Sequence, residues 1–541
     1  MGSLRRCSLA VVFCAGALGL GACTSNALRV KVATDPAFES AKVNVSEYGV
    51  DNTLVGQKLL SKLPVVLELS PQADRVTFAV EGGGVEPANL SVSTLELESR
   101  PVTDGARLVT ISVKLEFQEQ ARYNIIYDTT SGNLVAVQER VRAYLRTIED
   151  NGSSLGRVRE LPADSAIKGM SLSPDGKRLV YAKATLKLAQ ASTPSSERVA
   201  TADAAGGDRQ LIRVDAVNLE MIDLADSQGQ TGSGAVSHVT RDAFRDVYPS
   251  FTPDGNFIRF TSNRMHKQGA DILQLRATGQ EGGIQVFYDA GRDRTAMRPS
   301  TARDGTTVFA LKAEGPGSLA EGQIHIWIQG PNHPYPSEMA VGTDPQVSPD
   351  GRRIAYIDAE KNLSIINCDG SPPSVLCTDA TEIEQRYRAS LIEEIVAKAG
   401  DKLPDELERR FGKNMADRIT ETYGTNLADA EPRALMDAWL AREYNYDTRD
   451  FLPYSTPSWS PDGNHIVFTS MKGYDATGRP NQDIWMIDVG TTQMSQLTSN
   501  GSVDSDPVIS PDGQHVYFLS NRGGSWGIWQ MRGKPELAFH P

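Results

Sequence analysis

The sequence predicts a mainly β protein, namely a six-bladed β-propeller with an N-terminal β-sandwich-like domain and a helical insertion between blades four and five. Three observations carry this prediction. An Asp-Gly turn motif, usually Pro-Asp-Gly, recurs six times; apolar and polar residues alternate after each copy; and Gly (47) and Pro (29) far outnumber Phe (15). A strand-turn-strand unit that recurs along a chain is the sequence signature of a repeat architecture.

Length and composition limit the possible classes of protein. The chain has 541 residues, of which 40% are hydrophobic and 23% charged. This excludes collagen-like, disordered and multispanning membrane proteins and leaves roughly two to four domains of about 150 residues each. The net charge of −13 and the pI near 5.2 argue against nucleic-acid binding, which needs clustered Lys and Arg.

The first 22 residues have the features of a lipoprotein signal peptide. Arg5 and Arg6 precede a short apolar run over 9–20, and the segment ends Leu-Gly-Ala before Cys23. Such a run is too short to span a bilayer. The ending resembles the bacterial lipobox, so we expect lipidation of Cys23; the alternative is an ordinary signal peptide. By resemblance to Gram-negative lipoproteins, Thr24 points to anchoring in the outer membrane, on its periplasmic side.

Between Cys23 and the repeats, the pattern indicates a tether and then a small β domain. We expect the tether over 23–50 and the β domain over 51–150. Residues 63–69, 75–80, 90–98, 107–117, 123–127 and 133–137 alternate or run apolar at strand lengths, with turn residues between them. An antiparallel sandwich fits this pattern best.

The six repeats cover 155–541. Pro presets φ, Asp bonds its own backbone and Gly accepts positive φ, so each motif turns the chain between two strands. The turn residues are Asp175, Asp254, Asp304, Asp350, Asp462 and Asp512. Further strand-like segments follow, which gives the four strands of a propeller blade.

The last repeat lacks a fourth strand of its own. The segment 157–161 precedes Asp175 by about the distance at which Leu497 precedes Asp512. We therefore expect this N-terminal segment to complete blade six and close the ring, because closure removes exposed strand edges.

Two long intervals interrupt the repeat. Residues 184–210 are rich in Ala, Ser, Thr and Gly and predict a flexible loop. Residues 381–450 predict a helical insertion, because Thr381 and Glu384 fit a capping box and apolar residues then recur at helical spacing.

The cysteines leave three alternatives open. Cys368 and Cys377 are the two that lie in the repeats. We expect them to form a disulfide in an oxidising envelope, worth about 2 to 3 kcal/mol. Two free thiols are the first alternative; a metal site is the second, although no His lies nearby.

Candidate binding residues lie where the chain approaches the innermost strand of each blade, because these approaches converge near the propeller axis. We expect a negative funnel for a basic or amide-rich peptide or a cation; the alternative is that the acidic residues only cap turns. These candidates are Asp246, Tyr248, Arg298, Asp344, Thr456, Asp504 and Asp506.

The repeats resemble those of the TolB family, periplasmic propeller proteins of the bacterial Tol-Pal envelope system. The similarity lies in the Ser-Pro-Asp-Gly turns, the Ser-Asn-Arg endings at Arg264 and Arg522, and the Asp-Ile-Trp-Met segment at Asp483. It implies a binding role among envelope proteins, with a peptidoglycan-associated lipoprotein or Tol components as partners. Family members are ordinarily soluble and have an α/β N-terminal domain, whereas this chain carries the lipobox and a β domain.

Enzymatic activity is not expected. No Gly-x-Ser-x-Gly nucleophile motif occurs, and the seven His residues show no metal-ligand spacing, so we predict no catalytic residue, no metal ligand and no cofactor. The alternative function is a metal-dependent propeller enzyme such as a polysaccharide lyase, because some lyases have TolB-like repeats. Trp327, Trp485 and Trp529 are expected to pack between blades.

Overall fold

The chain divides into two units of very different size in the computed structural model, Met1–Val113 and Lys114–Pro541. Described residues are 28–35, 42–61, 63–80, 88–112, 117–128, 133–144, 155–163, 165–186, 198–202, 208–224, 236–266, 269–278, 283–313, 323–399, 413, 451–474, 480–499 and 501–532. The predicted signal peptide and Cys23 lie outside them. Among these residues, no helix has the length and apolar character needed to cross a membrane.

The N-terminal unit contains two four-stranded sheets, ordered β4-β1-β8-β7 and β3-β2-β5-β6. Their strands are β1 (Arg29–Asp35), β2 (Val43–Tyr48), β3 (Leu54–Leu60), β4 (Val65–Glu68), β5 (Arg75–Val80), β6 (Ala88–Ser93), β7 (Val102–Thr103) and β8 (Ala106–Ser112). Alternate residues of β2 and β5 are buried, as in a sheet with one face on a core. The short helix α1 (Thr94–Ser99) begins at Ser93, whose hydroxyl accepts the Glu96 N–H.

The boundaries predicted for this unit are wrong at both ends. The tether expected over 23–50 contains β1 and β2. Residues 117–144, expected in the same domain, form β9 (Phe117–Asp128) and β10 (Asn133–Tyr144), and β10 pairs with a strand of the larger unit. A strand-like pattern marks a strand but does not identify its partner, so the sequence could not assign this hairpin.

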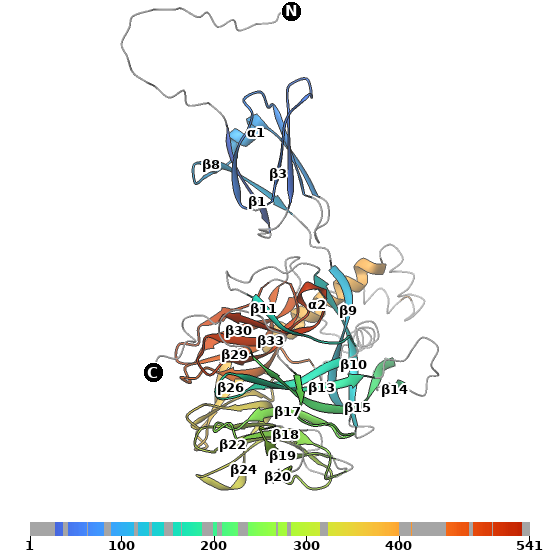
Figure 1. Ribbon diagram of the computed structural model, residues 1–541, viewed down its shortest axis with the longest axis vertical. Coiled ribbons are helices and arrows are strands. Elements are labelled where there is room, and N and C mark those ends of the chain that lie inside the picture. Colours follow the sequence, from blue (N-terminus) through green and yellow to red (C-terminus); the bar gives the residue numbers. More distant parts are fainter. Residues whose placement is uncertain are drawn as a thin grey trace, which may run out of the picture. The chain divides into compact units, whose positions relative to one another are not determined.

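In the described part of the larger unit, the strands form six groups of four, here called blades one to six (Figure 1). One long strand is shared by blades three and four and joins them into a single sheet, and further strands extend blade one. Blades one to three consist of β12 (Ser165–Leu172), β13 (Arg178–Leu186), β15 (Asp208–Asp223) and β16 (Val236–His238); β17 (Asp246–Phe251), β18 (Phe257–Ser262), β19 (Asp271–Arg276) and β20 (Gln285–Tyr288); and β21 (Arg294–Thr301), β22 (Thr307–Ala313), β23 (Ile324–Gly330) and the first part of β24 (His333–Val347).

Blades four to six continue the same order. They consist of the second part of β24, β25 (Arg353–Asp358), β26 (Leu363–Asn367) and β27 (Ser374–Cys377); β28 (Tyr454–Trp459), β29 (His465–Tyr474), β30 (Pro480–Asp488) and β31 (Met494–Gln496); and β32 (Asp504–Ile509), β33 (His515–Ser520), β34 (Gly527–Arg532) and β11 (Leu155–Glu160), with a 3₁₀ turn, η3 (Arg522–Gly524), before β34.

The first strands of the six blades contact one another in cyclic order. β12 contacts β17, and the series continues through β21, β24, β28 and β32 back to β12. β11 pairs with β34, with Leu155 opposite Met531 and Arg157 opposite Trp529. Figure 1 shows β11 beside the C-terminal strands. The predicted closure by an N-terminal strand is confirmed, and the sheets are consistent with a propeller.

The Asp-Gly turns form as their residues predict. In blade one, the Ser173 hydroxyl donates to Asp175 Oδ1 at 2.5 Å, the Lys177 N–H donates to the same oxygen at 3.1 Å, and Gly176 has φ +70°. Blades two, four, five and six repeat this arrangement with Ser or Thr two residues before the Asp. The turns therefore fix the connection between the first two strands of each blade.

Each junction between neighbouring blades holds a cluster of buried apolar side chains. Trp529 is buried in the cluster between blades five and six, and Trp327 and Trp485 pack partly buried against two others. The predicted packing of these three residues between blades is confirmed.

The expected flexible loop over 184–210 is replaced in part by strand. β13 continues to Leu186, β14 spans Arg198–Ala202 and β15 begins at Asp208. The first half of β15 pairs with both β14 and β10, so blade one carries an extension formed by β14, β15, β10 and β9. The prediction of a loop depended on the polar composition of this segment. It was wrong because a strand that pairs with β15 can form without an apolar face of its own.

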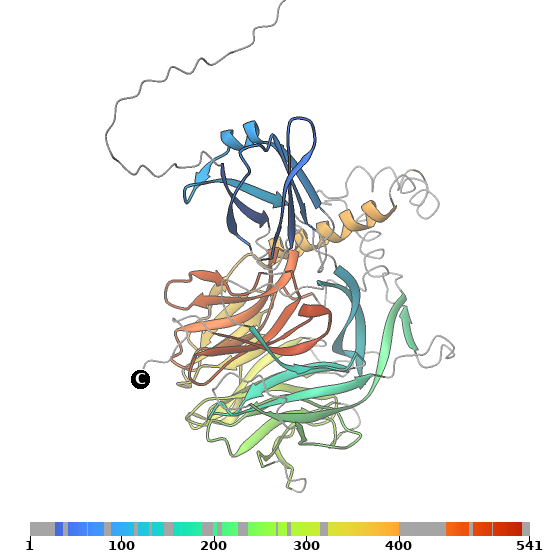
Figure 2. The same ribbon diagram turned by 45° about the horizontal axis from the view of Figure 1, so that its top comes forward.

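The helical insertion begins with α2 (Ala380–Ala399), seen as one continuous helix in Figure 2. It starts one residue before the predicted cap, because the Ile383 N–H bonds the Asp379 carbonyl and Thr381 already lies in the first turn. Ala380 and Ile383 are buried in the cluster between blades four and five, so the helix start docks on the propeller. Apart from Lys413, residues 400–450 lie outside the described ones.

The predicted disulfide is wrong. Cys368 and Cys377 are both free and buried, and they belong to different core clusters. Cys377 pairs across the sheet with Leu363, at the start of β26, whereas Cys368 follows the end of that strand. Burial raises the pKa of each thiol to about 12, so neither is a reactive thiolate.

Candidate functional site

The first strand of every blade contains a β-bulge at the same place. In blade two, Val247 pairs with Thr261 and Ser250 with Arg259, so two residues of β17 stand opposite one residue of β18. Equivalent register shifts occur in β12, β21, β24, β28 and β32. Bulges turn a side chain out of the regular alternation and are frequent beside functional sites.

One residue of each bulge has a left-handed backbone, six positions before the turn Asp. We call these six residues the axial ring: Gly169, Tyr248, Arg298, Asp344, Thr456 and Asp506. The five that are not glycine have φ between +49° and +56°. Such backbone costs of order 1 to 3 kcal/mol per residue and gathers at functional sites.

Successive members of the axial ring from Gly169 to Thr456 contact one another. A Cβ on Gly169 would lie 2.9 Å from Tyr248 Cα, so only glycine allows this approach. The Arg298 guanidinium lies over the Tyr248 ring at 4.3 Å, and its Nε is 2.7 Å from Asp344 Oδ1. The other Asp344 oxygen accepts the Thr456 N–H at 3.0 Å.

Blade five completes the series. The Thr456 hydroxyl lies 2.9 Å from the Thr469 hydroxyl, which accepts the Asp506 N–H at 3.1 Å. Hydrogen bonds, an ion pair and a cation–π contact therefore connect neighbouring ring members from Tyr248 to Asp506. The structure therefore brings the predicted candidates Tyr248, Arg298, Asp344, Thr456 and Asp506 together.

Arg298 is the central cation of this site. Burial acts to lower the pKa of its guanidinium, but Asp344, Tyr248 and Asp506 outweigh burial and raise the pKa above its ordinary value. The Arg298 side chain is 20% exposed and that of Asp344 only 1%. The ring therefore leaves part of the Arg298 cation accessible beside the partly exposed Tyr248, with the Asp344 carboxylate paired below the surface.

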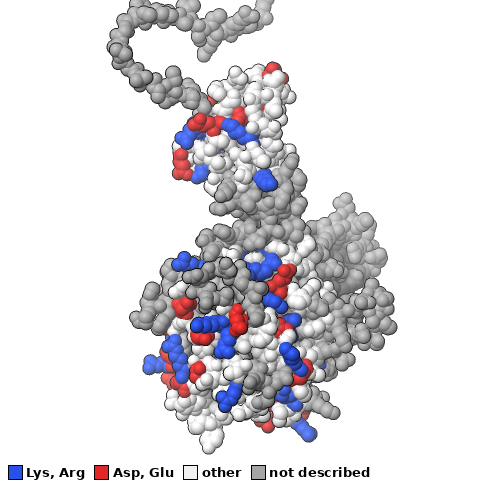
Figure 3. Space-filling model, viewed as in Figure 1, with Lys and Arg blue, Asp and Glu red and all other residues white. Residues whose placement is uncertain are grey.

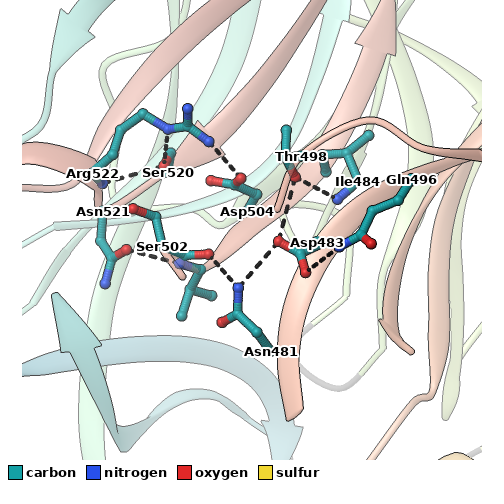
Figure 4. A network of polar contacts seen from close by, with 11 residues as sticks. Asn481, Asp483, Ile484, Gln496, Thr498, Ser502, Asp504, Ser520, Asn521 and Arg522 are labelled. Carbon is teal, nitrogen blue, oxygen red and sulfur yellow. Dashed lines mark hydrogen bonds and ion pairs between the residues drawn. The ribbon is translucent and has the colours of Figure 1, made fainter. Parts of the chain in front are cut away.

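The other two candidates, Asp246 and Asp504, lie elsewhere. Both are fully buried at the start of the first strand of their own blade. Asp504 accepts from Arg522 Nη2 at 2.5 Å with both side chains 0% exposed (Figure 4). Asp246 likewise pairs with Arg264 at 2.8 Å, and burial raises the pKa of Asp246. Two of the four carboxylates of the predicted negative funnel thus stabilise single blades.

Part of the face beside the axial ring is covered by the chain itself. Arg122 of β9 donates to Gln482 of blade five, and Gln118 Nε2 donates to the Gly524 carbonyl of blade six at 3.1 Å. Asn124 accepts from Lys168, next to Gly169, at 3.5 Å. β9 therefore runs across blades five, six and one, while Tyr248 and Arg298 belong to blades two and three.

Charges on the larger unit are mixed. On the face drawn in Figure 3, the Lys and Arg side chains alternate with Asp and Glu over the strands and form no extended patch of one sign.

Sequence spacing did not reveal one cluster of potential metal ligands. His266, Asp271 and Asp289 of blade two place one ligand atom each within 4.8 Å of one another. The available signal was the repeat itself, because Asp271 and Asp483 occupy the same position in two blades: each pairs with a Ser of the second strand.

Several solved structures are similar to this chain. A putative TolB from Agrobacterium tumefaciens is 13% identical, with 77% of this chain and 99% of that chain covered and a TM-score of 0.35. TolB from Acinetobacter baumannii is 12% identical, with coverages of 80% and 78% and a TM-score of 0.35. An oligogalacturonate lyase from Vibrio parahaemolyticus is 11% identical, with coverages of 77% and 98% and a TM-score of 0.37.

The comparison with curated proteins gives no match. The family comparison does: residues 452–536 match the model of the TolB beta propeller domain, the PD40 repeat. The matched segment covers β28 to β34, which are all the strands of blades five and six except β11. Over these two blades the chain is similar to the TolB beta propeller domain.

Proposed function

We propose that the protein is a lipid-anchored scaffold of the bacterial envelope, which binds a segment of another envelope protein at the axial ring. The observation that carries the proposal is the series of contacts from Tyr248 through Arg298 and Asp344 to Thr456 and Asp506. A site whose groups are already fixed loses little conformational entropy on binding, which favours affinity.

The exposed chemistry of the ring suits a peptide. Tyr and Arg are the residue types that most often dominate the energy of protein interfaces, because each combines a large contact area with hydrogen-bonding groups. Tyr248 and Arg298 are both partly exposed and lie against each other. An extended segment with a carboxylate or backbone carbonyl for Arg298 and an apolar side chain for Tyr248 matches this pair. The TolB resemblance supports a peptidoglycan-associated lipoprotein or Tol component as partner.

The test is crosslinking and affinity capture of the intact protein from envelopes. We expect a peptidoglycan-associated lipoprotein or Tol component to be recovered, and recovery to fall at least tenfold with Tyr248→Ala or Arg298→Ala. Tyr335→Ala is the matched control. Tyr335 lies in the first part of β24, is 80% exposed and is not a member of the ring. Equal recovery with all three variants would contradict the proposal, and cleavage of an oligosaccharide by the purified protein would favour the lyase alternative.

The anchor is tested separately. Replacing Cys23 by Ser is expected to release the protein from membranes into the soluble periplasmic fraction, because the acyl chains on this residue would hold it there. Membrane retention of the Cys23→Ser variant would show that the lipid assignment is wrong, whatever the ring binds.

A further inference from the structure

Blade two carries a buried carboxylate whose surroundings are unlike those of its counterpart in blade five. Asp271 is 0% exposed at the first position of β19, and its Oδ1 accepts the Ala290 N–H at 2.8 Å. Among the described residues, no donor hydrogen-bonds its Oδ2. A buried, unpartnered carboxylate oxygen is costly unless a cation lies beside it.

The groups that this oxygen faces increase the need for a cation. Ile272 pairs with Tyr288, so Asp271 and Asp289 lie beside each other on antiparallel strands. Like charges at such positions repel. His266 lies between them: its Nε2 is 3.2 Å from Asp289 Oδ1 and 3.6 Å from Asp271 Oδ2.

The spacing fits a bound metal ion. Ligand atoms at about 2.0 to 2.2 Å from a tetrahedral Zn²⁺ are roughly 3.4 Å apart. The two distances from the imidazole bracket this value, and all three ligand atoms lie within 4.8 Å of one another. One imidazole and two carboxylates suit first-row transition metals, whereas Ca²⁺ takes six to eight oxygen ligands.

We propose that His266, Asp271 and Asp289 form a binding site for a divalent transition-metal ion such as Zn²⁺, at the edge of blade two. The ligands come from the loop after β18, the start of β19 and the end of β20, so three neighbouring segments of one sheet position them. His266 is 22% and Asp289 68% exposed, which leaves the site accessible from solvent. With three protein ligands, a fourth position stays open to water or to a ligand. The proposal is independent of the envelope role and of the axial ring.

The experiment is calorimetric titration of Zn²⁺ into the intact, chelator-treated protein, with Asp271→Asn and Asp289→Asn as variants. Asp289 is exposed, so its variant tests the site even if the buried replacement were to disturb folding. His465→Ala is the matched control, because among the described residues His465 forms an ion pair with one carboxylate, Asp488, at 3.4 Å, and does not belong to a cluster of three potential ligands.

We expect one Zn²⁺ to bind per chain, with an affinity that falls at least tenfold in both Asp variants and is unchanged in His465→Ala. Titration with Ca²⁺ in place of Zn²⁺ should give no heat of binding at this site. The competing explanation is that His266 binds a proton and simply forms ion pairs with both carboxylates. Absence of Zn²⁺ binding, or binding that both Asp variants retain in full, would establish that explanation and overturn the proposal.

Discussion

Blades two and five place a carboxylate at the same point of the repeat and surround it with opposite chemistry. Asp483 accepts from Asn481 Nδ2 at 3.1 Å, Gln496 Nε2 at 3.0 Å and the Thr498 hydroxyl at 3.5 Å, as Figure 4 shows. Asp271 has one backbone donor and otherwise faces a His and a second Asp. The repeat thus fixes where the carboxylate lies, and the neighbouring segments decide whether it closes a hydrogen-bond network or can bind a cation.

The first strands of the same two blades differ in a related way. Blade two begins its first strand with Asp246, which pairs with Arg264. Blade five has Tyr454 at this position, and its carboxylate comes instead from Asp379, which accepts from Tyr454 and from Lys472 at 2.6 Å. Because Asp379 directly precedes α2, this exchange ties the helical insertion to the propeller. Both blades therefore have a carboxylate beside the start of the first strand, although in blade five it comes from a different segment of the chain.

The largest effect is expected at the buried ion pair of blade six, compared with that of blade two. Asp504→Ala leaves Arg522 buried without its carboxylate, which typically costs about 3 to 5 kcal/mol. Asp246→Ala should cost less, because Arg264 is 14% exposed and also lies 3.0 Å from Asp242. Urea unfolding followed by tryptophan fluorescence measures both losses; equal losses would show that Asp242 does not substitute for Asp246.

A smaller effect is expected where the axial ring is tightest. Gly169→Ala adds a Cβ 2.9 Å from Tyr248 Cα at φ +96°, and we expect a loss of about 2 kcal/mol. Gly305→Ala is the control, because it has similar backbone (φ +91°) but nothing within 4 Å of the added carbon. The difference between the two unfolding free energies isolates the contact with Tyr248, and identical losses would remove the evidence for close packing there.

The two carboxylates of the opening comparison should respond differently to the loss of charge. Asp483→Asn turns an amide N–H toward groups that donate, and we expect a loss of about 1 to 2 kcal/mol. Asp271→Asn removes a buried charge beside Asp289, so the metal-free protein should lose nothing or gain stability. Denaturant midpoints of the chelator-treated variants check this; a larger loss at Asp271 than at Asp483 would contradict the assignment of their surroundings.

The smallest effect concerns the turns that both blades share. The Thr252 hydroxyl and the Asn256 N–H lower the pKa of Asp254. A folded-state pKa below the unfolded value stabilises the protein above pH 4, and this contribution disappears as the pH falls through the folded value. Asp254→Asn should therefore slightly flatten the loss of stability between pH 5 and pH 2, measured by circular dichroism. An unchanged acid slope would show that this exposed turn carries no charge-dependent stability.

The sequence was most informative where the structure depends on local chemistry. The six turns around Asp175 and its equivalents need only neighbouring residues, and closure by 155–160 follows from counting strands. The sequence did not show which strands pair when they lie far apart in the chain. The hairpin β9–β10 has a strand pattern, but its pairing with β15 depends on the extension of blade one.

The sequence predicted where the candidate residues lie in the repeat better than it predicted what each of them contacts. Tyr248, Arg298 and Asp344 were found because all follow one repeat position, yet the bulge that joins them leaves no pattern of its own. Asp246 and Asp504 were misjudged, although the Arg that lies two residues after the second strand in these blades was the available signal for pairing. His266 and Asp289 meet Asp271 only through cross-strand register.

Thermal unfolding of Asp271→Asn and Asp483→Asn, each with and without Zn²⁺, tests the central comparison most directly. We predict that Asp271→Asn melts no lower than the parent protein without metal and shows no rise in Tm with Zn²⁺. Asp483→Asn should melt lower than the parent and keep the full rise in Tm with Zn²⁺. If the two variants shift alike, both without metal and with Zn²⁺, the two blades do not differ in the way that the structure indicates.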